Sequence, residues 1–411
     1  MTADHGAHTP PVLVVGAGPV GLTAALALRA LDIPVRLLEA DPQDRVRPGS
    51  RALYVHRDSL TLLDRMRPGL GTAIARRGIR WAGRRTRYRG HEVFARDHRD
   101  GSGAGGHGLP PYACLRQIET EGFLLESCRE AGVEFAWSAR VETVRSTPDG
   151  VEVHAADGRS WSAGYVIAAD GARSPVRAAI GRTMVGGRSN SHHVVVDLAD
   201  DPRVPEPALR TFHYHHPGLG GRHVLVVPFA GGRQVDLQCR PGEDPEEFLD
   251  EARLRDWLPQ VVDRGYLDRV LWASRYPFLQ LVADSFVDEH RRVLLAGEAA
   301  HLFAPFGARG MNSGIADADA AASAVALALR ATGPERARGA VEDYAAERTA
   351  AARHNRDAAG RALRHMRPRS PALRGAQRAA AALSPAVPRL GEWLERAPYG
   401  PRTAATAHGT Y

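Results

Sequence analysis

Three glycines and one glutamate near the start of the chain have the residue types and spacing that bind a dinucleotide. Gly16, Gly18 and Gly21 follow the pattern Gly-x-Gly-x-x-Gly, and Glu39 comes after the next apolar run. In this pattern the first glycine permits a tight turn, the second lets the backbone approach a pyrophosphate, and the third lets a helix pack on a strand. The carboxylate of Glu39 can accept hydrogen bonds from both ribose hydroxyls of an adenosine. The pattern predicts a dinucleotide site, and both NAD and FAD are compatible with it.

A strand, a helix and a second strand must hold these residues, and the flanking sequence predicts that order. Residues 11–15 form a short apolar run, residues 19–28 are rich in Ala and Leu, and residues 34–38 form the apolar run that ends at Glu39. A βαβ unit of this kind directs free N–H groups and the positive end of the helix dipole towards an anion. The glycines are therefore expected to form a phosphate cradle.

Two later segments repeat the theme of a strand that ends at an acidic residue and a glycine. The first delivers Asp170 and Gly171 to the start of a helix, with arginines close behind. The second delivers Gly297 and Glu298, and an Ala-rich helix follows over residues 313–329. Both arrangements suit a pyrophosphate or a ribityl chain, because a helix N-terminus can face an anionic group.

Composition limits the protein class. A chain of 411 residues is expected to form two or three domains with an ample apolar core. No run is long enough to span a membrane, and the polar first ten residues do not resemble a secretion signal, so a cytoplasmic protein without membrane contact is expected. The three cysteines are odd in number and far apart, which excludes a disulfide framework and a Cys-x-x-Cys metal site. They are expected to be buried thiols, and no metal is predicted.

All 54 basic residues are arginines and none is lysine. This excludes a Walker lysine, a Schiff-base lysine and a lysine general base. Seven arginines crowd into residues 76–89, which is compatible with nucleic-acid binding, with attraction of an anionic cofactor or substrate, or with a solvated face. We favour the solvated face, since no nucleic-acid motif accompanies the cluster.

The middle of the chain has a different character from its two ends. Residues 79–97 predict a hairpin followed by a glycine-rich loop at 100–108, and residues 133–161 predict a β-meander after a helix at 117–131. From residue 186 to 285 the pattern is mostly strand without a glycine fingerprint, which suggests a wall for a substrate. The predicted elements there are four strands at 192–198, 210–216, 222–229 and 233–240, and a helix near 245–258. Residues 341–411 predict Ala/Arg-rich helices broken by prolines, with a disordered tail from Pro398.

Together the three motifs resemble the para-hydroxybenzoate hydroxylase family, the single-component FAD-dependent aromatic monooxygenases. The resemblance covers roughly residues 11–350 and keeps the family's order and spacing of motifs. It implies an α/β fold: a Rossmann-like FAD-binding domain of the GR2 type, an inserted mixed β-sheet substrate domain and a C-terminal helical segment. The implied boundaries are 1–78, 109–185 and 286–345 for the FAD-binding domain, 79–108 and 186–285 for the substrate domain, and 346–411 for the helical segment.

The resemblance also implies roles for individual residues. Glu39 would bind the adenosine ribose, and Arg51 and Gln117 would contact the FAD diphosphate region. Asp170, with Gly171, would contact the diphosphates of FAD and of the nicotinamide nucleotide. Glu298, after Gly297, would bind the ribityl chain. The backbone N–H groups of Gly310, Met311 and Asn312 would bind the flavin pyrimidine edge, and Pro305 would line the reactive face. A helix N-terminus at that edge would stabilise the anionic reduced flavin.

Two positions depart from the family pattern. Glu298 stands where the family usually has Asp, and its longer carboxylate can still accept a ribityl hydroxyl bond. Ala308 and Arg309 stand where the family usually has Gly-Gln. Arg309 would either raise the flavin reduction potential or bind an anionic substrate, and we lean slightly towards the first.

By the same resemblance, NAD(P)H reduces FAD, O₂ adds at the flavin C4a to give a hydroperoxide, and the distal oxygen is transferred to an activated ring. The expected substrate is a phenol-like aromatic or polyketide-type small molecule. NADH and NADPH both remain open as co-substrates, as does the oligomeric state. A flavin oxidase, a dehydrogenase or an epoxidase would share the fold and is the alternative. A flavin halogenase is disfavoured by the absence of lysine and of a Trp-x-Trp motif, and a non-catalytic protein would need a failed flavin site.

A phenol substrate needs a base or a hydrogen-bond acceptor, and with no lysine the choice falls on histidine and tyrosine. The candidates in the strand-rich region are His192, His193, His213, Tyr214, His215, His216 and His223. Strand alternation places Phe212, Tyr214 and His216 on one face and His213 and His215 on the other. Of these we take His216 and Tyr214, with Pro305 and Arg309, as the candidate catalytic residues.

Overall fold

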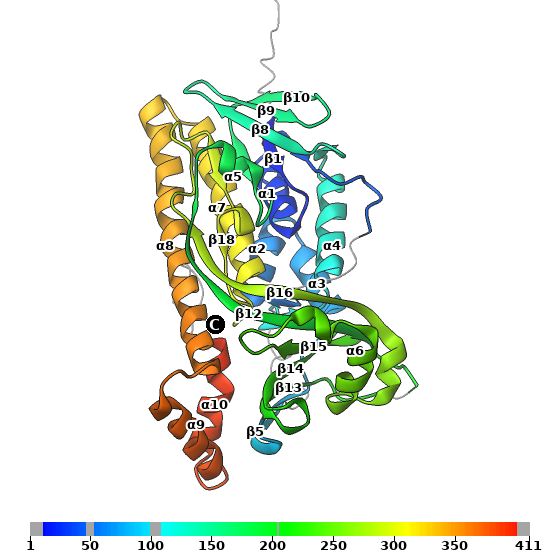
Figure 1. Ribbon diagram of the computed structural model, residues 1–411. Coiled ribbons are helices and arrows are strands. Elements are labelled where there is room, and N and C mark those ends of the chain that lie inside the picture. The colour runs from blue at the N-terminus through cyan, green and yellow to red at the C-terminus, as the bar shows by residue number, and fades with distance from the viewer. Residues whose placement is uncertain (1–10, 47–52, 99–107, 204, 401–411) are drawn as a thin grey trace, which may run out of the picture.

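The computed structural model describes residues 11–46, 53–98, 108–203 and 205–400. Arg51, most of the predicted loop at 100–108 and the end of the predicted tail lie outside these residues. Figure 1 shows a smaller sheet around β1 and a large sheet around β12 to β16, with the long helix α8 (Pro334–Met366) running beside both.

A five-stranded parallel sheet carries the glycine motif. Its strands, in spatial order, are β17 (Val293–Leu295), β11 (Val166–Ala168), β1 (Val12–Val15), β2 (Val35–Leu38) and β7 (Glu134–Ala136). The helices packed around it include α1 (Pro19–Arg29), α4 (Gln117–Glu130) and α7 (Arg309–Leu329). Because helices cover this sheet, its strands β17, β11 and β1 are apolar and almost fully buried, whereas the edge strand β7 is partly exposed. The predicted βαβ unit is confirmed, and α7 begins four residues earlier than expected, at Arg309.

An eight-stranded mixed sheet forms the second layer. Its order is β18 (His301–Leu302), β16 (Val270–Ala283), β12 (Met184–Ala199), β15 (Gly232–Gln238), β14 (Arg222–Phe229), β13 (Leu209–His216), β4 (Gly83–Tyr88) and β5 (His91–Asp97). Only the β13–β4 pair is parallel. The predicted hairpin and the four predicted strands are present. The sequence interpretation missed β16, which pairs with β12 over most of its length and connects the two sheets (Figure 1).

The two faces of β12 and β15 are chemically different. Val194, Val196 and Leu198 pack with Val235 and Leu237 in a separate apolar cluster beneath the sheet. This cluster also contacts the short helix α6 (Glu251–Trp257), near the predicted helix at 245–258. The alternate residues of both strands therefore face the opposite side, towards the parallel sheet.

The predicted division of faces along β13 is wrong at its end. His215 has a positive φ of 52°, and the pairing with β14 shifts register between His213 and His216. This bulge turns the last residues over. As a result His216 lies against His213, with ring centroids 4.9 Å apart, and His215 lies 4.7 Å from the ring of His223.

The remaining elements connect or cover the two sheets. They are β3 (Tyr54–His56) paired with β6 (Tyr112–Cys114), the helices α2 (Arg57–Met66), α3 (Leu70–Arg77) and α5 (Pro175–Ala179), and the meander β8 (Val141–Ser146), β9 (Val151–Ala155) and β10 (Ser160–Ala163). The meander is confirmed from residue 141 onward. The first strand assigned to it, β7, instead extends the parallel sheet. The three cysteines are buried free thiols, as expected.

Prolines start the C-terminal helices. Helix α8, helix α9 (Pro371–Leu383) and helix α10 (Pro388–Arg396) each have a proline in the first turn, where its missing N–H costs nothing. The predicted onset of disorder at Pro398 is wrong for residues 398–400. A 3₁₀ turn at Ala397–Tyr399 packs there, and the ring of Tyr399 lies 4.8 Å from the guanidinium of Arg210. Within the described part of the chain, no helix is both long and apolar enough to cross a bilayer.

Candidate active site

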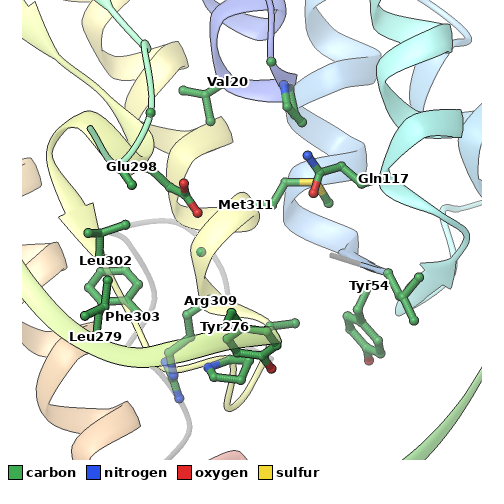
Figure 2. Close-up of a pocket in the computed structure, with 18 of the residues that line it drawn as sticks. Val20, Tyr54, Gln117, Tyr276, Leu279, Glu298, Leu302, Phe303, Arg309 and Met311 are labelled. Carbon is green, nitrogen blue, oxygen red and sulfur yellow. The ribbon is translucent and has the colours of Figure 1, made fainter. Parts of the chain in front are cut away.

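A cavity of about 730 Å³ lies between the two large sheets and is lined by residues from all three sequence motifs. The predicted site residues that line it are Gly16, Gly18, Glu39, Gln117, Asp170, Gly171, Glu298, Pro305, Arg309, Gly310 and Met311. Figure 2 shows Gln117, Met311 and Glu298 around one part of the cavity and Tyr54, Tyr276 and Arg309 around another. The fold thus brings together residues that are almost 300 positions apart in sequence.

The three glycines of the first motif have different tasks. Gly16 has φ +99°, and a Cβ there would lie 2.5 Å from the carbonyl oxygen of Ala169. A Cβ on Gly21 would lie 1.8 Å from the carbonyl oxygen of Gly16, so this glycine lets α1 pack on the turn. Gly18 has an ordinary extended backbone, with φ −79°, and a Cβ there would meet no atom of the described residues within 4 Å. Gly18 is therefore the glycine that keeps the cavity open.

Glu39 holds the glycine turn from the end of β2. Its carboxylate accepts hydrogen bonds from the backbone N–H of Ala17 at 2.6 Å and of Asp41 at 3.0 Å, and pairs with Arg45 at 2.9 Å. Burial works against ionisation, but these hydrogen bonds and the Arg45 charge outweigh it and lower the pKa of Glu39. The ionised carboxylate is thus fixed beside the cavity, where the sequence predicts an adenosine ribose.

Asp170 follows β11 and faces the cavity next to the glycine turn. Its Oδ2 accepts a hydrogen bond from the N–H of Val176 at 3.1 Å, and its buried Oδ1 has no partner among the described residues. Burial raises the pKa of Asp170. The open Oδ1 leaves Asp170 with an unused polar contact next to the glycine turn.

The N-terminus of α7 lies at the cavity beside Glu298. Figure 2 shows Glu298 and Met311 on neighbouring parts of the wall, and no hydrogen bond from the described residues holds the Glu298 carboxylate. Gly310 also lines the cavity and has open space where a Cβ would be. Gly297 does not line it: with φ +60°, it lets the turn pack on Val20, whose Cγ2 would lie 2.8 Å from an added Cβ. This helix of 21 residues directs its positive dipole end into the cavity.

Asn312, one turn into α7, fixes the position of that helix end. Its Oδ1 accepts hydrogen bonds from the N–H of His56 at 2.9 Å and the hydroxyl of Ser59 at 2.7 Å. Its Nδ2 donates to the carbonyl oxygens of Tyr54 and Ala308, each at 2.8 Å. The side chain therefore lies outside the cavity lining and acts as a clamp, a role that the sequence interpretation, which considered only its backbone N–H, did not include.

Tyr214 and His216 do not line the cavity. The hydroxyl of Tyr214 donates to the carbonyl oxygen of Leu394 at 2.7 Å and lies 3.1 Å from Nε2 of His365. Its burial raises its pKa, so this tyrosine joins the sheet to α10 and is not presented to a ligand. His216 is turned away by the bulge at His215. Neither of these two predicted catalytic side chains is brought together with Pro305 and Arg309.

The cavity wall of β12, β15 and β16 carries polar residues that the sequence interpretation did not assign to a site. His193, Asp236 and Tyr276 form one hydrogen-bonded group there, and all three line the cavity. His193 was one histidine among several candidates, and Asp236 was not considered. The signal was the strict alternation of polar and apolar residues along 234–238, which marks a strand with one polar face.

Aromatic rings complete the wall. Tyr54 stacks on Tyr112, with ring centroids 4.4 Å apart, and Trp81 packs on Tyr112 at 5.0 Å. Phe212 and Phe306 line the cavity from β13 and from the loop before α7. These rings give a planar aromatic ligand apolar surfaces to pack against.

A family model described as an FAD binding domain matches residues 9–359 of the chain. The chain belongs to this FAD-binding family. Its relatives place it among the FAD-dependent aromatic monooxygenases of the para-hydroxybenzoate hydroxylase type, which confirms the family, the fold class and the cofactor predicted from the sequence.

Several of the similar proteins are monooxygenases or hydroxylases by name. This FAD-binding protein is 33% identical over 359 residues to 6-methylpretetramide 4-monooxygenase of Streptomyces rimosus, a match that covers 83% of the chain and 59% of that relative. The crystal structure of p-nitrophenol 4-monooxygenase PnpA from Pseudomonas putida DLL-E4 matches with a TM-score of 0.76 and 25% identity, covering 96% of this chain and 99% of that one. The complex of aklavinone-11 hydroxylase with FAD and aklavinone matches with a TM-score of 0.74 and 26% identity, covering 88% and 69%.

The geometry of the cavity fits FAD. Gly18, Gly171 and Gly310 line it, and at none of them would a Cβ meet an atom of the described residues within 4 Å. A side chain at any of the three would occupy space that an extended ligand needs to approach the backbone. The unpartnered Oδ1 of Asp170 and the open carboxylate of Glu298 offer further polar contacts between these points. Residues that can contact FAD therefore lie along the cavity of this FAD-binding protein.

Arg309, the departure from the family pattern, lies at the cavity and reaches towards the C-terminal segment. Its Nη1 donates to Oδ1 of Asn355 on α8 at 2.9 Å, and its Nη2 donates to the carbonyl oxygen of Tyr399 at 3.2 Å. Both partners are distant in sequence, and Tyr399 itself lines the cavity. Arg309 therefore joins the first turn of α7 to the segment that closes this side of the cavity.

Replacing Arg309 with Gln is expected to release the turn at 397–399. Charge-assisted hydrogen bonds of this kind contribute about 1.5–3 kcal/mol each, so protease cleavage of the folded protein near this turn is expected to rise at least about tenfold. Arg356→Gln on the surface of α8 is the matched control and should leave the cleavage rate unchanged. An equal rate in R309Q and the parent would show that Arg309 does not hold the segment. The flavin reduction potential and the affinity for anionic phenols of R309Q would test the two roles predicted from the sequence.

Proposed function

We propose that this protein is an FAD-dependent monooxygenase that uses NAD(P)H and O₂ to hydroxylate a phenol-like aromatic or polyketide-type substrate. One observation carries the proposal: a single cavity joins the residues of the FAD motifs to an aromatic and polar wall of the second sheet. Three of its relatives support it, because they are a 6-methylpretetramide 4-monooxygenase, a p-nitrophenol 4-monooxygenase and an aklavinone-11 hydroxylase. The chain spans 59% of the length of the S. rimosus relative, so its activity and substrate are inferred from the site.

Bound FAD would accept electrons from NAD(P)H and supply them to O₂. The protein's own residues bind the cofactor and stabilise charge on it. Gly18, Glu39 and Asp170 hold the adenosine and diphosphate end, and Glu298 accepts a hydrogen bond from the ribityl chain. The N-terminus of α7 stabilises negative charge at the other end of the cavity. The proposal includes the predicted division into an FAD-binding domain, a substrate domain and a C-terminal helical segment, with the boundaries given above.

The substrate is placed by the second sheet. Tyr54, Trp81 and Phe212 provide apolar contact and exclude water from the reacting ring. Pro305 and Phe306, in the loop that precedes α7, also line the cavity. A ring bound there would lie between the helix end and the polar face of β12 and β15.

The test is a screen of phenols and polyketide-like aromatics for accelerated NAD(P)H oxidation by the FAD-loaded protein, with the product formed under ¹⁸O₂ analysed by mass. We expect at least one compound to accelerate NAD(P)H oxidation and to gain one ¹⁸O atom. Substrate consumption without label would indicate an oxidase or a dehydrogenase instead. Labelling of an isolated alkene instead of an aromatic ring would indicate an epoxidase. If no compound accelerates the oxidation, the proposed activity is contradicted.

A further inference from the structure

A histidine and an aspartate on the substrate wall are arranged as an acid–base pair. Nδ1 of His193 on β12 is hydrogen-bonded to Oδ1 of Asp236 on β15. The hydroxyl of Tyr276 on β16 donates to Oδ2 of the same carboxylate at 3.3 Å. His193 is 6% exposed and Asp236 is 8% exposed, so water contributes little to their hydration. Three neighbouring strands thus combine to fix one imidazole at the cavity.

The other ring nitrogen of His193 is unoccupied. Its Nε2 is buried and has no hydrogen-bond partner within the described ranges. A carboxylate only accepts hydrogen bonds, so Asp236 selects the tautomer in which Nδ1 carries the proton. Nε2 then has a free lone pair. A buried lone pair of this kind costs free energy unless a ligand donates to it.

The pair lies where the proposed substrate ring would bind. The ring of His193 packs edge-on against Phe278, with centroids 4.1 Å apart, and lies 6.3 Å from the ring of Phe306. Phe306 follows Pro305 and precedes the N-terminus of α7. His193 is therefore close to the loop that the sequence assigns to the reactive face of the flavin.

We propose that His193, oriented by Asp236, accepts the phenolic proton of the substrate and so fixes the substrate class as ring-activated phenols. The inference rests on the proposed function and adds to it the residue that activates the ring. In the step, the O–H bond of the phenol breaks, a new N–H bond forms at Nε2, and the electron pair stays on the oxygen as phenolate. The imidazolium keeps its Nδ1–H bond to Asp236. The phenolate then donates electron density to the ring carbon that receives oxygen.

The charged and titratable groups around His193 support this direction of proton transfer. Asp236 contacts it from β15 and Tyr276 from β16, the rings of Phe278 and Phe306 lie near it, and His193 itself lines the cavity. Arg367, which follows α8, lies 5.5 Å from the ring of Phe278 and adds positive charge behind it. The carboxylate in direct contact accepts the Nδ1 proton in a hydrogen bond and so leaves Nε2 as the acceptor.

The test uses the FAD-loaded full chain and 4-nitrophenol, whose phenolate and neutral forms absorb differently. We expect the bound probe to ionise at least about one pH unit below the free probe, which is a tenfold shift in its ionisation equilibrium. His193→Gln should return the ionisation of the probe to that of the free compound. Asp236→Asn should do the same, because its amide can donate to Nδ1 and leave the proton on Nε2. A purely structural role for Asp236 would not produce that loss in an isosteric variant that still folds.

Turnover provides the second readout. For a phenol that is neutral at pH 7, kcat of His193→Gln should fall about 10²-fold or more, and it should recover as the pH rises and the phenol ionises by itself. FAD affinity should stay unchanged in both variants. His192→Gln is the matched control: it makes the same change on the adjacent residue of β12, which does not line the cavity, and it should behave like the parent.

The outcomes separate the two proposals. If 4-nitrophenol is not ionised by the FAD-loaded parent protein, or if His193→Gln ionises it equally well, the pair does not accept the proton. If the probe is ionised as expected but no phenol accelerates NAD(P)H oxidation or gains oxygen, the proposed monooxygenase function fails while the proton-accepting site stands.

Discussion

Replacing Gly18 with Val is expected to weaken FAD binding by at least about 100-fold, or ~2.8 kcal/mol, without unfolding the apoprotein. The backbone of Gly18 is extended, so a β-branched residue is conformationally acceptable there. Its Cβ would meet no described protein atom but would project into the cavity, where the diphosphate must approach the N–H groups of the turn. The measurement is FAD titration by flavin fluorescence, together with thermal unfolding of the apoprotein.

Two other glycines provide controls for this result. Gly164→Val introduces the same side chain at a position with open space outside the cavity, and FAD affinity should be unchanged. Gly21→Val should instead prevent folding, because the new Cβ would lie 1.8 Å from the carbonyl oxygen of Gly16. Normal FAD binding by Gly18→Val would mean that the diphosphate does not lie against this turn.

The second large effect concerns a buried charge network behind the cavity. Asp317 on α7 is 1% exposed. Its Oδ1 accepts a hydrogen bond from Nε of Arg348 at 2.7 Å. Its Oδ2 lies 2.6 Å from Nε2 of His301 and accepts a hydrogen bond from the N–H of Gly297 at 3.1 Å. Asp317→Asn leaves the buried guanidinium of Arg348 without its buried counter-charge, with only the longer contact of 3.4 Å to the exposed Glu347. We expect the free energy of unfolding to fall by about 3–5 kcal/mol, as for other broken buried pairs, measured by urea denaturation.

Asp319→Asn, two residues along the same helix, is the matched control. Asp319 pairs with Arg65, whose side chain is 62% exposed, so its loss should cost under about 1 kcal/mol. An equal loss in the free energy of unfolding for the two substitutions would show that the buried network stabilises the protein no more than an exposed ion pair does.

The network also predicts how stability depends on pH. Burial opposes ionisation of Asp317, but the charges and hydrogen bonds of His301 and Arg348 prevail and lower its pKa. Because the folded-state pKa lies below the unfolded value, the stabilisation is fully present above the ordinary carboxyl range near about 4 and is lost as the pH falls below it. Asp317→Asn should lack this part of the acid dependence. Unfolding titrations between neutral pH and pH 3 would measure the difference.

Much of the cofactor site could be predicted from the sequence because it depends on local backbone geometry. Gly16 and Gly21 are required by close contacts within one turn, and Asp170 and Glu298 are delivered by the ends of neighbouring strands. Parallel strands bring their carboxyl ends to one edge of the sheet. Three correctly spaced motifs therefore predicted both the ligand and the wall that it contacts.

The substrate wall was decided by tertiary structure. His193 meets Asp236 only because β12 and β15 pair in one register across 43 residues of sequence. A shift of one strand by one residue would place the two side chains on opposite faces of the sheet. The bulge at His215 removed His216 from the predicted face. Arg309 finds Tyr399, 90 residues away, through the packing of α7 against the C-terminal segment. The sequence by itself determined the FAD motifs, since each is a local conformational requirement; strand register and helix packing decided which side chains face the substrate, because those contacts form only when distant segments meet.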